Sequence, residues 1–117
     1  MKCAAMLTDA TTVLDRRQLR DVTMDDEELM REILTALIDD TVLQFPLLES
    51  AIRERDPKKC AQLAHYSKGA CASIGANAAA AVFKRIEKQA ACEAFQECGI
   101  SLTILAGEID RLRHEAI

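Results

Sequence analysis

Residues 56–75, DPKKCAQLAHYSKGACASIG, carry the clearest helix boundaries in the chain. Asp is preferred just before the first turn of a helix and Pro at its first position, so Asp56 and Pro57 predict a helix start. Gly75 can adopt the left-handed conformation that ends helices, so we expect this helix to reach about Ile74. One face of it is apolar at helical spacing and comprises Cys60, Leu63, Ala64, Ser67, Cys71 and Ile74. The stretch therefore predicts an amphipathic helix that packs against others.

Two helices are predicted before this stretch. Thr23, followed by acidic residues, is expected to cap a long helix whose apolar stripe extends to Ile52. Pro46 lies within that stripe and is expected to kink or divide the helix near Gln44. A short helix capped by Asp15 is expected to end near Val22. Its inward-facing residues would be Leu14, Leu19 and Val22.

Two further helices are predicted after Gly75. Asn77 is expected to cap a helix that ends near Ala91, and apolar residues at spacings of three and four from Phe95 to Ala116 predict the last helix. Four amphipathic helices with short connections favour an antiparallel four-helix bundle. The fold class is therefore all-α, with a short accessory helix at the N-terminus.

Composition supports this fold and excludes several others. The 117 residues include only four Gly and two Pro and no Trp, whereas the turns of an all-β protein need Gly and Pro repeatedly. The length suits one domain, which we place at residues 15–117, with residues 1–14 as an N-terminal arm.

Charge and hydropathy limit the partners and the compartment. A formal charge of −4 argues against a nucleic-acid partner. Because no apolar run approaches about 20 residues and Met1 to Leu7 is too short for a secretory signal, we expect a soluble, cytoplasmic protein without membrane contact. The five cysteines show no metal-ligand spacing and are expected to be reduced, buried small side chains: Cys3, Cys60, Cys71, Cys92 and Cys98.

The candidate chemistry lies on the polar face of the helix 57–74. His65 lies about 150° from the centre of the apolar stripe, so it is expected to face solvent. Lys68, three residues on, places an ammonium group beside the imidazole, where an incoming anion would sit. Gly69 costs an exposed helix about 1 kcal/mol relative to Ala, and its bare backbone would let another molecule approach the imidazole. An accessible nucleophile with a counter-charge is implied.

Here the sequence resembles the histidine-containing phosphotransfer (HPt) domains of two-component phosphorelays. The resemblance rests on residues 64–69, AHYSKG, on residues 73–76, SIGA, and on the later pair Ile86-Glu87. It covers about residues 15–115. Ser67 departs from the family pattern, which usually has Leu or Ile at this position. We expect its hydroxyl to bond the carbonyl of Leu63, one turn back.

By this resemblance, His65 would be the phosphoacceptor, Lys68 would support the phosphoryl group, and Gly69 would admit the partner. The partners would be response-regulator receiver domains, including those of hybrid histidine kinases. The chain would pass phosphoryl groups reversibly between His65 and receiver aspartates as a monomer in transient complexes. It would need no cofactor of its own, because the Mg²⁺ of the reaction belongs to the receiver.

The surroundings of His65 suggest a wider contact surface. Small or polar residues share its face, and basic residues of the following helix are expected to add positive potential. The predicted partner-binding residues are Lys58, Ala61, Gln62, Ala72, Lys84 and Lys88.

Two other interpretations stay open. The chain could be a helical scaffold or adaptor without phosphotransfer, or a domain phosphorylated directly by the ATP-binding domain of a histidine kinase. Nothing in the sequence resembles an ATP site, so a phosphocarrier without kinase activity of its own is favoured.

Overall fold

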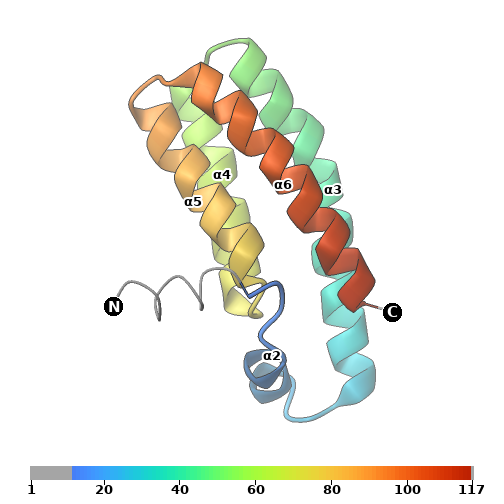
Figure 1. Cartoon of the computed structure of the whole chain (residues 1–117). Coiled ribbons are helices and arrows are strands. Elements are labelled where there is room, and N and C mark those ends of the chain that lie inside the picture. Colours follow the sequence, from blue (N-terminus) through green and yellow to red (C-terminus); the bar gives the residue numbers. More distant parts are fainter. Residues whose placement is uncertain (1–11, 117) are drawn as a thin grey trace, which may run out of the picture.

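The computed structural model describes residues 12–116, which form five helices connected by short turns (Figure 1). They are α2 (Arg16–Val22), α3 (Glu27–Arg53), α4 (Pro57–Ser73), α5 (Asn77–Ala91) and α6 (Phe95–Glu115). The all-helical prediction is confirmed for this part of the chain. Residues 1–11 of the predicted arm, with Cys3, lie outside the described residues.

The four long helices surround one core. α4 packs against α3 and α5, and α6 packs against α5 and α3, which closes a ring. Successive helices run in opposite directions (Figure 1), consistent with the predicted antiparallel bundle. The largest fully buried apolar side chains are Leu48, Phe83, Ile86, Leu105 and Leu112. Within residues 12–116 no helix is long and apolar enough to cross a membrane.

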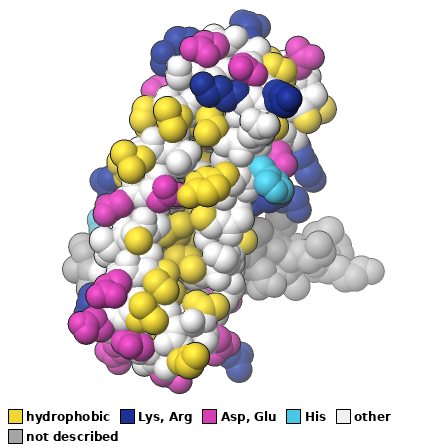
Figure 2. All heavy atoms as spheres, turned by 180° about the vertical axis from the view of Figure 1, so that it is seen from behind, with side chains coloured by type: hydrophobic (Ala, Val, Ile, Leu, Met, Phe, Trp, Pro, Cys, Tyr) yellow, Lys and Arg dark blue, Asp and Glu magenta, His cyan; other side chains and the backbone are white. Residues whose placement is uncertain are grey.

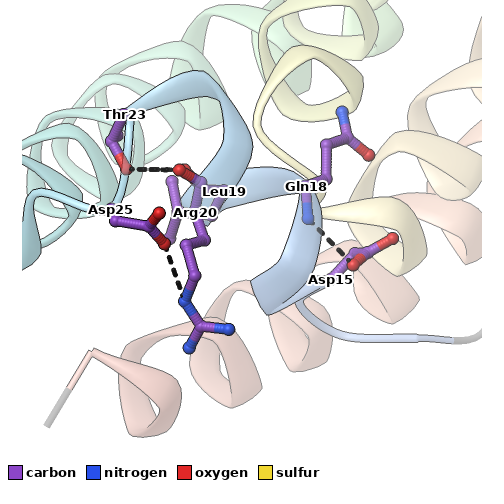
Figure 3. Close-up of polar contacts among 6 residues, drawn as sticks. All are labelled: Asp15, Gln18, Leu19, Arg20, Thr23 and Asp25. Atoms are coloured by element: carbon purple, nitrogen blue, oxygen red, sulfur yellow. Dashed lines mark hydrogen bonds and ion pairs between the residues drawn. The ribbon is translucent and has the colours of Figure 1, made fainter.

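The start of α3 differs from the prediction. Asp26, not Thr23, caps this helix, and its carboxylate accepts a hydrogen bond from the N–H of Leu29 at 3.0 Å. Thr23 instead ends α2, where its buried hydroxyl donates to the carbonyl of Leu19 at 2.8 Å (Figure 3). Met24 and Asp25, both with positive φ, form a turn between the two helices. Because of this turn, α3 begins only at Glu27.

Two other boundary predictions differ from the structure. Of the two outcomes expected at Pro46, division of the helix does not occur, because α3 continues through this residue. Asn77 does not cap α5, whose first turn has no side-chain cap. The carbonyl of Thr12 performs that task by accepting from the N–H of Ala78 at 2.8 Å.

The short helix α2 is tied to the ends of two long helices. Asp15 caps it by accepting from the N–H of Gln18 at 3.1 Å (Figure 3). The Gln18 amide donates to the carbonyl of Ala72 in α4 at 2.6 Å, and Arg16 donates to the backbone and carboxylate oxygens of Glu115. Leu14 and Leu19 are buried as predicted, whereas Val22 is not. Val22 is 50% exposed because it ends α2 beside the turn, where no bundle helix covers it.

Candidate functional site

The helix that carries the candidate site has the boundaries expected from its sequence. The Asp56 carboxylate accepts from the N–H of Lys59 at 3.1 Å, Pro57 begins α4, and Gly75 follows its end with φ of +91°. A Cβ at Gly75 would lie 2.7 Å from the carbonyl oxygen of Asp15, so only glycine fits there. The buried residues of α4 are Cys60, Ala64, Ser67 and Cys71. His65 therefore lies outward, with 67% of its side chain exposed.

A carboxylate of α5 joins His65 to Lys68. Glu87 Oε2 lies 3.1 Å from Nδ1 of His65, and Glu87 Oε1 lies 3.0 Å from Nζ of Lys68. Glu87 and Lys68 are each 29% exposed, so this pair is partly withdrawn from water. The sequence analysis used Glu87 only as part of a resemblance and gave it no role. Its contact with His65 depends on how α5 packs on α4, which no spacing within one helix reveals.

The contact with Glu87 constrains the imidazole. An ionised carboxylate only accepts hydrogen bonds, so Nδ1 of His65 carries the proton and donates it. In a neutral ring, Nε2 then has the free lone pair on the other side of the ring. This contact therefore selects the tautomer of the neutral ring in which Nε2 is free to act as a nucleophile.

Glu87 is held in its charged form. Partial burial raises the pKa of its carboxyl group, but the hydrogen bonds and charges of Lys68 and His65 outweigh burial and lower this pKa overall. At neutral pH the group is therefore a carboxylate. It serves as counter-ion to Lys68 and as acceptor for His65.

Several of the α4 residues around His65 have small side chains or none, as the sequence suggested. Gly69 is exposed, and a Cβ built there would meet no atom within 4 Å. The protein's own packing therefore does not require glycine at this position. Lys58, Gln62 and Ala72 are exposed and Ala61 is half-buried on the same side of α4.

Ser67 differs from its expectation. It is buried as predicted, but its hydroxyl has no hydrogen-bond partner among the described residues, so the expected bond to the Leu63 carbonyl is absent. The departure from the family pattern therefore leaves a small polar atom in the core, behind the site.

The basic residues of α5 fall on two sides of that helix. Lys84 and Lys88 are exposed and lie about 60° and 100° around the axis from Glu87 in the same direction, so they lie together to one side of the position that meets His65. Arg85 is also exposed but lies about 160° from Glu87, away from the site. Lys84 and Lys88 thus form a basic row beside His65.

A feature that the sequence analysis missed lies on the other side of His65. Tyr66 is 54% exposed, and the Asp40 carboxylate of α3, by its charge and a hydrogen bond, raises the pKa of the Tyr66 phenol. Leu43 and Leu47, which are 68% and 48% exposed, lie three and seven residues after Asp40 on the same side of α3. We call Leu43, Leu47 and Tyr66 the apolar strip. Figure 2, which views the molecule from the side of α3 and α4, shows hydrophobic side chains along this face.

The cysteines described by the structure are reduced and stand apart from this site. Cys60, Cys71 and Cys98 are buried as predicted, whereas Cys92 is exposed in the turn after α5, where no helix covers it. Burial raises the pKa of Cys60 to about 11 and, with a contribution from Asp40, that of Cys71 to about 12. These buried thiols are therefore poor nucleophiles at neutral pH.

Comparison with known proteins agrees with this geometry. The crystal structure of histidine-containing phosphotransfer protein B (HptB) from Pseudomonas aeruginosa PAO1 is 22% identical to the chain, with a TM-score of 0.82. The match covers 89% of this chain and 90% of that one, and it shows a shared fold. No curated protein sequence matches the chain. A family model described as the Hpt domain matches residues 25–115, and the chain therefore belongs to the Hpt domain family.

Proposed function

We propose that this protein is a phosphorelay intermediate, in which His65 accepts a phosphoryl group from a receiver-domain phosphoaspartate and passes it to another receiver. The observation that carries the proposal is the exposed imidazole of His65, whose Nδ1 is bonded to Glu87 and whose Nε2 faces away from that bond. Family membership supports the same reaction. The protein would act as a phosphocarrier without a kinase or ATP site of its own.

The reaction needs few groups on this chain. The lone pair of Nε2 attacks the phosphorus of the aspartyl phosphate, the N–P bond forms, and the P–O bond to the aspartate breaks. Because the transition state is loose, with charge on the equatorial oxygens, positioning and counter-charge dominate catalysis. Lys68, three residues from His65, would supply the counter-charge. The Mg²⁺ of the reaction would be bound by the receiver.

The surroundings of His65 supply two kinds of docking contact. On one side, Lys84 and Lys88 would attract the negative charge around a phosphorylated aspartate, and Lys58 would add to it. On the other side, the apolar strip would be buried by the partner, since exposed apolar patches of this kind mark interaction sites. Between these two sides, Gly69 leaves the backbone bare. We propose a monomer that meets receivers transiently in the cytoplasm.

The test of the proposed function is phosphoryl transfer from a purified, radiolabelled receiver. We expect label on the wild-type protein that is acid-labile and base-stable, as a phosphoramidate is. The variant His65→Gln should take up none, while His114→Gln, at the far end of α6, should behave as wild type. Label that persists in His65→Gln would refute the site. The absence of transfer from every receiver of the source organism would favour the scaffold interpretation.

The basic row is tested by charge reversal. Lys84→Glu should slow transfer from the receiver roughly tenfold at low salt, because steering by charge changes association rates by 10-fold or more. Arg85→Glu changes the net charge equally on the far side of α5 and should have a much smaller effect. The difference should shrink as salt screens the charges. Equal rates for the two variants at low salt would contradict a role for this row.

A further inference from the structure

The outward side of α6 carries apolar side chains that the core of the bundle does not use. The core-facing residues of this helix include Cys98, Leu105 and Leu112. Ile100 and Ile104 lie about 140° further round the helix, where they are 60% and 41% exposed. Because α6 already buries a full apolar face, the packing of the bundle does not account for two exposed isoleucines one turn apart.

These isoleucines belong to a row of residues with alternating spacings of three and four. We call this row the outer seam of α6, and it comprises Glu97, Ile100, Ile104, Gly107 and Arg111. Such spacing keeps residues on the line along which two helices pack side by side. The two ends of the outer seam are exposed and have opposite charges. The Arg111 guanidinium contacts Glu108 at 2.7 Å, but the side chain is 64% exposed and has further N–H groups for a second carboxylate.

The outer seam is complementary to itself when a second copy runs antiparallel. Pairing about a two-fold axis between Ile100 and Ile104 places both isoleucines of one copy against those of the other. Arg111 then lies about one helical turn beyond Glu97 of the second copy, within reach of these two long side chains. Gly107 lies opposite that glutamate and leaves room for it. A parallel pair would instead place like charges beside each other at both ends.

We propose that the outer seam of α6 is a self-association surface, through which two copies of this chain pair antiparallel. Since α6 packs against α3 and α5 and does not contact α4, the pairing leaves the His65 helix of each copy accessible to a receiver. One helix per copy makes a small interface, so the pair is weak. The monomer proposed above prevails in dilute solution, and the dimer forms as the concentration rises. This inference does not depend on phosphotransfer.

The first experiment measures the mass of the protein by analytical ultracentrifugation from about 1 μM to about 1 mM, which spans weak dissociation constants. The wild-type mass should rise from one copy towards two. Ile100→Glu, an exposed position where folding is retained, should raise the dissociation constant by roughly 10- to 100-fold. Leu43→Glu is the matched control, because Leu43 is 68% exposed on α3, and it should associate as wild type. A monomeric wild type at every concentration would overturn the inference. Loss of association in Leu43→Glu alone would also overturn it, because the apolar strip would then be the contact.

The second experiment tests the antiparallel arrangement by exchanging charges. Glu97→Arg and Arg111→Glu should each weaken association by roughly tenfold, because each places like charges together twice in the symmetric pair. The double variant restores opposite charges and should associate as wild type. Thermal unfolding of each variant in dilute solution checks that the monomer is folded. Association that is unchanged in both single variants would refute the antiparallel pairing, as would a double variant that is weaker than either single one.

Discussion

Gly69→Ala separates what the fold needs from what a partner needs. Gly69 is exposed in the middle of α4, and a Cβ there would meet no atom within 4 Å. The added methyl group therefore creates no clash, and alanine is about 0.5–1 kcal/mol more favourable than glycine in a helix interior. The variant should be more stable than wild type by this amount. For a domain of this size the thermal midpoint should rise by about 2–5 °C.

The same methyl group should harm transfer. If a receiver packs closely over Gly69 to reach His65, one extra carbon overpacks the contact, which typically costs about 1–3 kcal/mol. The second-order rate constant of transfer should then fall by roughly 5- to 150-fold. The assay is the time course of label transfer from a phosphorylated receiver, measured beside thermal unfolding of the same sample.

Gly107→Ala is the matched control. Gly107 is also exposed within a helix with open space around its Cβ position, but it lies on α6, which has no part in the site. It should show the same gain in stability and wild-type transfer. If Gly69→Ala transfers as fast as Gly107→Ala, close approach over Gly69 is refuted. If Gly69→Ala is less stable than wild type, the open space described for its Cβ is wrong.

Three further predictions concern stability and reactivity. Gly75→Ala should destabilise the protein by about 1–3 kcal/mol in urea unfolding, because φ is +91° and the Cβ would lie 2.7 Å from a carbonyl oxygen; unchanged stability would show that α2 shifts freely. The pKa of Glu87 lies below its ordinary 4.5, so its stabilisation is present above that pH and is lost as the pH falls through the lower, folded-state pKa. Glu87→Gln should therefore lose stability at pH 7, and the difference should vanish in acid; a constant difference would contradict this. Iodoacetamide should modify Cys92 well before Cys71, whose pKa is about 12, in peptide mapping of the folded protein, and equal rates would contradict the burial of Cys71.

Local signals in the sequence predicted most of the helix boundaries. Asp56, Pro57 and Gly75 bound α4 because each acts through its own backbone and that of the next few residues. Thr23 and Asn77 misled for the same reason. Both are good capping residues, but Thr23 bonds back into α2, and the carbonyl of Thr12, far away in sequence, caps α5 in place of Asn77.

The candidate site was only partly predictable. The exposure of His65 follows from the phase of one helix, which a sequence reveals. The bond from His65 to Glu87 and the approach of Tyr66 to Asp40 each join two helices, so they depend on rotation and register between helices. A single sequence contains no direct signal for either. The apolar strip was missed for a related reason, since whether Leu43 and Leu47 lie on the side of Tyr66 depends on how α3 is oriented against α4.

The attachment of α2 has a consequence for the order in which the protein can be assembled during synthesis. Arg16 is bonded to Glu115, 99 residues later in the chain, so this contact can form only when nearly all of the domain has left the ribosome. The bond from Gln18 to Ala72, by contrast, needs only α4. On a growing chain, α2 can therefore settle against the His65 helix first and be fastened to α6 last. A chain cut short before residue 115 would retain His65 and its partner Glu87 but lack the final tie between the two ends of the domain.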